Sequence, residues 1–230
     1  MPTYDKIILC LANSRKTSGR CIAGRELVNG NLGAWIRPVS ARENAELSEE
    51  DRRFENGRDP RVLDILRITM IEPKPHDFQI ENHLINADYY WTLQGRATWQ
   101  QAYAAVDGAG RSLWSNMSSS YSGVHDRVAE DQAVPADGSL RLIEVHDLQV
   151  NVVVEGAEFG NGKRKVRGRF THGGVQHYLS ITDPPMERQY LLGQNGAFQV
   201  GHALLCISLS EPFNGWTYKL IAAVITPQNC

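Results

Sequence analysis

The sequence predicts a mainly β protein, built as two small β-barrels in series with a short helical and loop insertion between them. Strand-like segments fall into two blocks, and the segment with the strongest helical pattern, 96–107, lies between these blocks. Turn dipeptides separate the short apolar runs, which is typical of antiparallel meanders that close into barrels. We therefore expect an N-terminal barrel with the insertion at 1–136 and a C-terminal barrel at 137–230.

Each expected strand is a run of apolar or β-branched residues between polar or turn-forming residues. In the first block the runs lie at 4–12, 20–28, 33–39 and 63–72. In the second block they lie at 140–155, 164–171, 175–182, 203–209 and 216–226, with a short helix at 187–193. In the helix expected at 96–107, Trp99, Tyr103 and Val106 share one face, which indicates packing against the core. The serine-rich segment 115–125 has few apolar anchors, so we expect a weakly ordered loop.

The composition excludes several classes of protein. The chain has 230 residues and a formal net charge of −2, which argues against a strongly basic nucleic-acid binder. No apolar run approaches the roughly 18 residues of a membrane span, and the N-terminus lacks a signal-peptide pattern. None of the four cysteines forms a C-x-x-C pair, so we expect reduced thiols in the cytoplasm, and neither a metal nor a cofactor.

Local basic segments are the candidates for contact with nucleic acid. The first 40 residues contain six basic and two acidic residues, and four of the basic ones lie at 13–25, where no acid occurs. Glycines in this stretch let the backbone approach a ligand, and its hydroxyls add donors, so the stretch suits phosphate binding. A solvated hairpin loop is the alternative interpretation. The candidate residues here are Ser14, Arg15, Lys16, Arg20 and Arg25.

An aromatic and basic pattern follows in the strand expected at 33–39. Trp35 and Arg37 would lie on one face of this strand, because side chains alternate along β-structure. An aromatic ring beside a guanidinium can stack a base and hold a phosphate. A half-buried Trp beside an Arg whose stem covers apolar surface is an equally good interpretation.

The segment 163–182 carries the most specific geometric argument. Gly173-Gly174 predicts a two-residue turn, which pairs Arg169 with Tyr178 and Arg167 with Ser180. One face of the hairpin is then apolar, with His177 as a core histidine, and the other is basic. The basic face fits either a groove for a nucleic-acid backbone or a solvated surface. The candidate binding residues are Lys165, Arg167, Arg169, His172 and Tyr178.

Signals for catalysis are weak. The chain has no nucleophile elbow, no zinc-protease motif and no deaminase motif. The spacing of two histidines and the acids between them at 76–83 matches no standard zinc site, and a further acid precedes two prolines at a strand end. The candidates for catalysis are His76, Glu81, His83 and Asp183.

Seven short stretches, distributed along nearly the whole chain, carry a family likeness. They are CLANSRK at 10–16, GRCIAG at 19–24, WIRPVS at 35–40, ENHLI at 81–85, RGRF at 167–170, LSITDP at 179–184 and YKLIAA at 218–223. In these stretches the chain resembles a bacterial family of dual OB-fold domain proteins. The resemblance implies two OB-like β-barrels, a link to nucleic acid, and a role in nucleic-acid modification.

We expect a protein that binds DNA or RNA, single-stranded or locally opened, within a nucleic-acid modification or defence system that supplies a protein partner. Two alternatives remain open. One is an enzyme acting on a nucleotide or nucleic acid through the cluster at 76–83 and Asp183, and the other is a protein-interaction subunit without a ligand of its own. A clustered basic surface would favour binding over interaction alone, and a deep pocket with converging His, Asp and Arg side chains would favour the enzyme.

Overall fold

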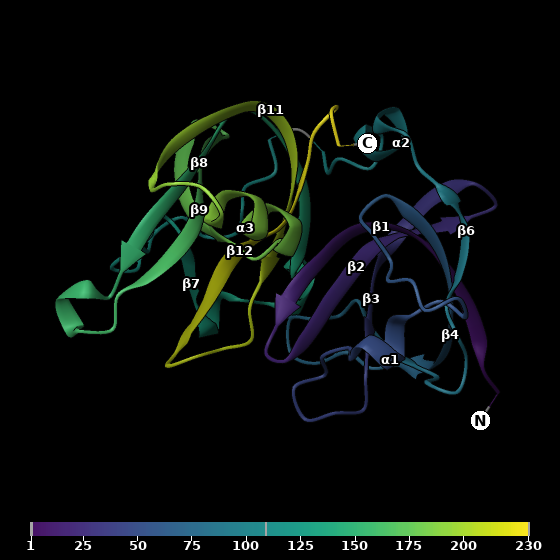
Figure 1. Cartoon of the computed structure of the whole chain (residues 1–230). Coiled ribbons are helices and arrows are strands. Elements are labelled where there is room, and N and C mark those ends of the chain that lie inside the picture. The colour runs from purple at the N-terminus through teal and green to yellow at the C-terminus, as the bar shows by residue number, and fades with distance from the viewer. Residues whose placement is uncertain (1, 109, 230) are drawn as a thin grey trace. The chain divides into compact units, whose positions relative to one another are not determined.

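Within residues 2–108 and 110–229, which the computed structural model describes, the strands form two six-stranded sheets (Figure 1). This confirms the mainly β class. The chain divides into two compact units, unit 1 with the residues up to Ala105 together with Gln228 and Asn229, and unit 2 from Val106 to Pro227. Asp107 is tied to the second sheet: its amide donates to the Leu142 carbonyl at 2.9 Å and its carboxylate accepts from the Leu142 amide at 2.7 Å.

Unit 1 is a five-stranded barrel with one added strand. In sheet order the barrel strands are β1 (Tyr4–Lys16), β2 (Gly19–Val28), β3 (Asn31–Val39), β5 (Asn82–Ile85) and β4 (Asp64–Pro73). Antiparallel pairing of β1 with β4 closes the ring, and β3 with β5 is a parallel pair. The strand β6 (Thr92–Arg96) extends the sheet beside β4, and the short helix α1 (Glu49–Arg52) lies in the connection from β3 to β4.

The core of unit 1 is filled by alternate residues of these strands. Ile8, Ile22, Ile36 and Leu66 are at most 2% exposed and belong to one apolar cluster. Gly24 of β2 passes so close to β1 that a Cβ atom there would lie 2.1 Å from the Leu9 carbonyl oxygen. Gly24 pairs with Cys10 at this point, next to a register shift of the kind that bends a strand.

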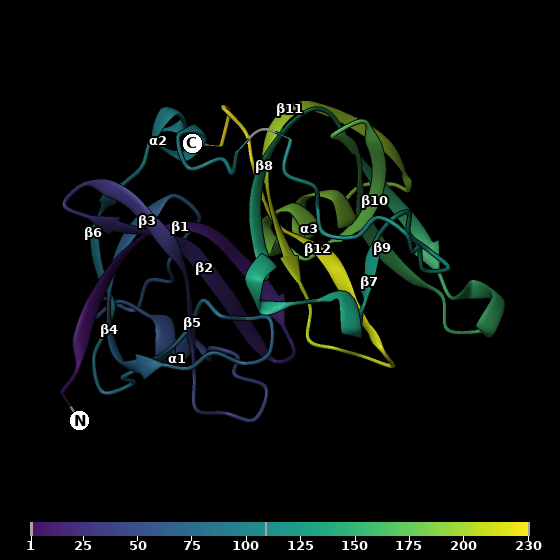
Figure 2. The ribbon, with the colours of Figure 1, turned by 180° about the vertical axis from the view of Figure 1, so that it is seen from behind.

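Unit 2 repeats the strand order of unit 1 (Figure 2). Its barrel strands, in sheet order, are β8 (Leu140–Glu155), β9 (Lys163–His172), β10 (Val175–Ile181), β12 (Trp216–Ile225) and β11 (Gly196–Leu209). The barrel closes through β11 and β8, and β10 with β12 is again the parallel pair. The strand β7 (Arg127–Ala129) pairs with β12. When the strands of each barrel are numbered along the chain, their spatial order around both barrels is 1-2-3-5-4-1. This is the order of a five-stranded Greek-key barrel.

The helix α3 (Pro184–Leu191) connects the third and fourth strands of unit 2 and is capped at both ends. At its start Asp183 accepts hydrogen bonds from the amides of Met186 and Val224, at 3.5 and 3.0 Å. At its end Arg164 of β9 donates to the carbonyls of Leu191 and Gly193. A cation at a helix C-terminus is also stabilised by the helix dipole. These contacts of Arg164 hold the end of α3 against β9.

Most expected strands are present within a few residues, and the largest differences lie in the segments that join them. The helix expected at 96–107 is shorter in the structure, where α2 covers Trp99–Tyr103. A capping box formed by Thr98 and Gln101 stabilises its N-terminus. The strands β5, β6 and β7 were not anticipated, and short 3₁₀ turns occur at Glu130–Gln132, Pro135–Asp137 and Ala157–Phe159.

Candidate nucleic-acid interface

The hairpin of β9 and β10 has the register that the glycine turn predicts. Arg169 pairs with Tyr178, Gly168 with Leu179, and both turn glycines adopt positive φ. The Arg169 guanidinium lies over the Tyr178 ring, 4.9 Å from its centroid, and donates to the Gln176 side chain at 3.2 Å. Arg169 is exposed and Tyr178 is half-buried, whereas their neighbours Gly168 and Leu179 are buried, so the pair lies on the outer side of the second and third strands.

The remaining basic residues of this hairpin have different environments. Arg167 is only 6% exposed and forms an ion pair with Glu155, while its guanidinium lies 5.5 Å from the centroid of the Tyr178 ring. The Arg167 guanidinium therefore lies between the Glu155 carboxylate at the end of β8 and the Tyr178 ring, and it does not face solvent. Lys165 is exposed opposite Val153. His172 is half-buried, and its Nε2 is 2.9 Å from the Arg111 carbonyl oxygen.

The inner face of the hairpin is apolar apart from His177. This ring is fully buried and stacks on Phe170, with centroids 5.3 Å apart. Burial, together with the smaller effect of the Lys219 charge, lowers the pKa of His177 to about 3. The backbone of His125 lies near the ring, yet neither ring nitrogen has a hydrogen bond of standard geometry within the described residues. The expected core histidine is therefore buried and neutral, without a conventional partner.

Unit 1 carries a similar pair at the equivalent place. Arg25 of the second strand pairs with Trp35 of the third, and the guanidinium lies 5.7 Å from the centroid of the ring. Arg25 also donates to the Gly33 carbonyl at 2.8 Å, which fixes its position. Their neighbours Gly24 and Ile36 are buried, so the alternation directs Arg25 and Trp35 to the outer face.

The basic stretch 13–25 is a β-hairpin. β1 continues to Lys16 and β2 begins at Gly19, so only Thr17 and Ser18 form the turn, with Thr17 at φ 46°. Arg15 pairs with Arg20 across the hairpin, Arg15 is exposed, and Lys16 and Arg20 are half-buried. This turn joins the first and second barrel strands, where OB barrels have one of their binding loops. Ser14 is buried and donates to the Cys21 carbonyl, so it belongs to the structure of the hairpin.

Arg37 is enclosed in unit 1. It is 2% exposed, and its guanidinium is 3.1 Å from the carboxylate of Glu81, which is also buried. The Arg37 amide also donates to the Glu81 carbonyl. The pair joins β3 to the residue before β5, where the barrel closes. Its burial keeps Arg37 from the outer surface that Trp35 reaches.

The four candidates for catalysis occupy separate environments. Glu81 is held by Arg37, and the Nδ1 atom of His83 is 2.7 Å from the Tyr4 hydroxyl. Burial lowers the pKa of His83. His76 is exposed beside Asp77, and Asp183 caps α3. Among the described residues these side chains do not form a group of metal-ligand type, and Glu81 and Asp183 make the ion-pair and helix-cap contacts described above.

A buried lysine near the hairpin is not predicted by the sequence pattern. Lys219 of β12 is 1% exposed, and its amine donates to the Ser115 carbonyl and to the Asn116 side chain, both at 2.7 Å. Burial lowers the pKa of Lys219 to about 7, although Asp126 opposes that shift. In the sequence, the one indication of this burial is that Lys219 lies at an inward-facing position of a mostly apolar strand.

The serine-rich segment 115–125 is anchored at both ends. Lys219 holds its start, and near its end Val124 exchanges two backbone hydrogen bonds with Tyr178, at 3.2 and 3.0 Å. Between these anchors Met117 and Tyr121 are 87% and 86% exposed. The backbone of this central part is also held, because the Ser120 amide donates to the Asp126 carboxylate at 2.6 Å and Ser118 forms a β-bridge with Arg127. The weak order expected for the segment therefore applies at most to its exposed side chains.

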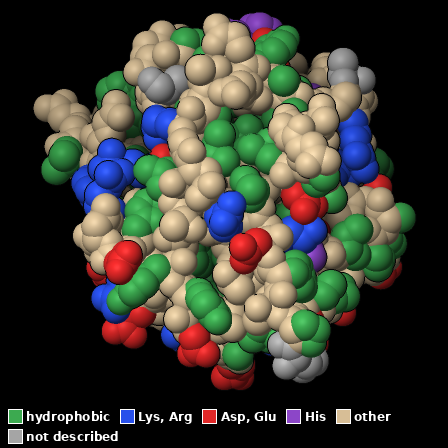
Figure 3. Space-filling view, turned by 90° about the vertical axis from the view of Figure 1, so that its right-hand side faces the viewer, with side chains coloured by type: hydrophobic (Ala, Val, Ile, Leu, Met, Phe, Trp, Pro, Cys, Tyr) green, Lys and Arg blue, Asp and Glu red, His purple; other side chains and the backbone are tan. Residues whose placement is uncertain are grey.

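Charge is distributed without a continuous basic field on the face drawn in Figure 3. Lys and Arg side chains alternate there with Asp and Glu side chains and with apolar ones. This agrees with the formal net charge of −2. On this face, contact with a polyanion would therefore depend on few cations at defined positions.

Comparison with known proteins gives a single finding. A family model described as "Dual OB-containing domain" matches residues 6–224. Searches of curated proteins and of solved structures found no match. No helix in the described part of the chain is long and apolar enough to cross a membrane.

Proposed function

Because the chain belongs to the dual OB-containing domain family, we propose that it binds single-stranded or locally opened nucleic acid on the outer faces of the second and third strands of its barrels. OB barrels bind oligonucleotides and oligosaccharides on this face and on the loops beside it. The observation that carries the proposal is the repeated pair, Arg25 with Trp35 and Arg169 with Tyr178, at equivalent positions of the two barrels.

Each pair offers the two contacts that a single strand needs. A base can stack on an aromatic ring, which is worth about 1–3 kcal/mol per base and requires no particular sequence. A guanidinium beside the ring can bind a phosphate oxygen. Arg15, Lys16 and Arg20 at the turn of unit 1, and Lys165 of unit 2, are the further cations that we assign to phosphate contacts.

The mixed surface charge has a consequence for affinity. Each phosphate contact releases counterions, so binding weakens as salt rises, with a slope set by the number of contacts. A few cations at defined positions give a shallow slope. Stacking then supplies a larger share of the affinity than it does in a strongly basic protein.

The test is fluorescence anisotropy with labelled DNA and RNA strands of about 20 nucleotides, longer than the roughly 4–16 that one OB barrel covers. We expect Tyr178→Leu and Trp35→Leu each to raise the Kd about 5- to 150-fold, the loss of one stacked base. Tyr89→Leu is the matched control, because Tyr89 is 56% exposed and lies outside the strands. Wild-type affinity in both variants, with native circular dichroism, would refute the proposal.

The wider setting also belongs to this proposal. We place the protein in a nucleic-acid modification or defence system of the bacterial cytoplasm, with a protein partner, on the basis of the family resemblance. Parallel titrations with DNA, RNA and duplex competitors establish which polymer is bound before any partner is sought.

A further inference from the structure

We propose that Glu144, His146 and His202 of unit 2 bind one divalent transition-metal ion, with Zn²⁺ as the best-fitting class. The ligand atoms of these three side chains all lie within 4.8 Å of one another, the one such group among the described residues. The carboxylate oxygen Oε1 of Glu144 is 2.8 Å from Nε2 of His202 and 3.6 Å from Nε2 of His146. This inference is independent of nucleic-acid binding.

The strand pairing explains why the three residues meet. Glu144 and His146 are two apart on β8, so they share a face. On the facing strand β11, Ala203 pairs with Val145 and Gly201 with Leu148, so His202 alone stands opposite two residues of β8. This is a β-bulge, which bends a strand and redirects side chains, and such bulges occur next to functional sites.

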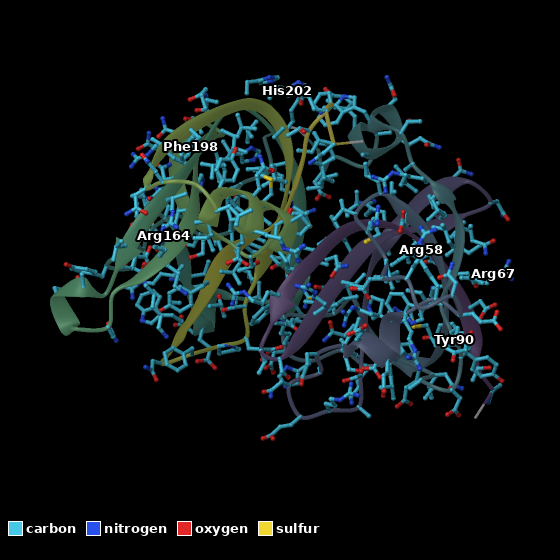
Figure 4. The ribbon with its side chains drawn as sticks, in the orientation of Figure 1. Arg58, Arg67, Tyr90, Arg164, Phe198 and His202 are labelled. Atoms are coloured by element: carbon cyan, nitrogen blue, oxygen red, sulfur yellow. The ribbon has the colours of Figure 1, made fainter. Side chains whose placement is uncertain are left out.

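His146 and Asp147 are the two residues of β8 opposite His202, and Asp147 is not part of the proposed metal site. Its carboxylate accepts a hydrogen bond from the Thr171 amide at 3.0 Å. The group therefore offers two imidazoles and one carboxylate. His202 is drawn at the outer bend of β11, where solvent can reach it (Figure 4).

The chemistry of the group fits a zinc-like ion. Tetrahedral bonds of about 2.0 Å separate ligand atoms by about 3.3 Å, and the two distances from Glu144 lie on either side of this value. The rings of His146 and His202 are stacked, with centroids 4.7 Å apart. Two histidines and one glutamate leave a fourth position for water, as in zinc sites that are open to solvent. Side-chain exposures of 25%, 73% and 40% for Glu144, His146 and His202 place that position at the surface.

A metal ion here would link the first and fourth strands of the barrel at their bend. Imidazole and carboxylate ligands suit zinc, copper, nickel and iron more than calcium or magnesium, which prefer oxygen ligands alone. The proposal therefore predicts selectivity for Zn²⁺ or Co²⁺ over Mg²⁺.

The experiment is isothermal titration of the full chain with ZnSO₄, in a Cys21→Ser, Cys230→Ser background. The two remaining thiols, Cys10 and Cys206, are buried. We expect one ion per chain, and at least a tenfold loss of affinity in each of His146→Ala, His202→Ala and Glu144→Gln. His76→Ala is the control, because His76 is exposed next to an acid in unit 1. Titration with Co²⁺ should give visible absorption bands that the His202→Ala variant lacks.

Three results would overturn the proposal. They are the absence of stoichiometric Zn²⁺ uptake, uptake that the three variants leave unchanged, and uptake that His76→Ala abolishes. Circular dichroism of each variant separates loss of the site from loss of the fold.

Discussion

Acid should destabilise unit 2 through one buried imidazole. His177 is 0% exposed, and burial lowers its pKa to about 3, whereas a histidine in an unfolded chain titrates near pH 6.5. Above about pH 6.5 both states are neutral at this residue. Between about pH 6.5 and 3 the unfolded chain binds a proton that the folded chain does not, so stability falls as the pH falls. Below about pH 3 both states are protonated and the loss is complete.

The size of the effect follows from the two pKa values. At about pH 4.5 the unfolded imidazole lies two units below its pKa, and each unit is worth about 1.4 kcal/mol, so unfolding gains roughly 3 kcal/mol. At about pH 7.5 the same contribution is close to zero. His177→Phe removes it, and a phenyl ring there would stack on Phe170 without burying two nitrogens.

The assay is native-state hydrogen exchange with peptides from β9 and β10, which report on unit 2 alone, at about pH 7.5 and 4.5. We expect the free energy of opening of His177→Phe, relative to wild type, to rise by roughly 3 kcal/mol between these pH values. Any fixed packing cost of the larger ring cancels in this comparison. His76→Phe is the control at an exposed histidine and should show no such change. An equal difference between His177→Phe and wild type at both pH values would refute the reasoning.

Three further predictions concern the same hairpin and the neighbouring strand β12. Because the pKa of Lys219 is lowered to about 7, the unfolded chain binds the extra proton between about pH 7 and 10.5, so wild-type stability should rise with pH in this window. Urea unfolding should show this rise in the free energy of unfolding for wild type and not for Lys219→Met. If the free energy depends on pH equally in both, the Lys219 amine is ionised in the folded protein and the prediction is wrong. Arg167→Ala should cost about 1–3 kcal/mol of stability, because it leaves Glu155 without its buried partner. Arg169→Ala should leave stability within about 0.5 kcal/mol and lower the salt slope of nucleic-acid binding by about one. The opposite assignment, with Arg169 structural and Arg167 salt-sensitive, would contradict the geometry.

Sequence reasoning succeeded where one local signal determines pairing. Gly173 and Gly174 fix the hairpin turn, and alternation then sets which residues face each other, so Arg169 opposite Tyr178 could be predicted. It was less successful where polarity suggested a loop. The stretch after Ala12 is polar on both faces and yet paired as strands up to Lys16, because backbone hydrogen bonds do not require apolar side chains.

The helical segment shows a different limit. The sequence predicts a buried face made of Trp99, Tyr103 and Val106. In the structure the fully buried residues are Ala102 and Ala105, and Tyr103 is 46% exposed. Three residues beyond the C-cap of the helix, Ala104, Asp107 is bound to Leu142 in unit 2. Periodicity could not predict this contact, which joins residues far apart in the sequence.

The group proposed to bind a metal ion and the buried lysine could not be predicted, for the same reason. Glu144 and His146 form a local pair in the sequence, but His202 reaches them only through the pairing of β8 with β11 and the bulge between them. Lys219 becomes unusual only when the fold buries it. Arg37 and Arg167 have the sequence pattern of phosphate-binding residues, and acids that close in from other segments, Glu81 and Glu155, enclose them.

The repeated Arg–aromatic pair is harder to explain by folding than by binding. A barrel core constrains the inward positions of its strands, such as Ile36 and Leu179, and leaves the outward positions open to many residues. An exposed cation–π contact is worth only about 0.5–1 kcal/mol, a small part of the stability of a domain. The two units share no sequence repeat, and yet both place an arginine on the second strand and an aromatic ring opposite it on the third. A ligand that meets the same face of both barrels is the simplest physical reason for this coincidence, and it is the reason that the paired Trp35 and Tyr178 variants test.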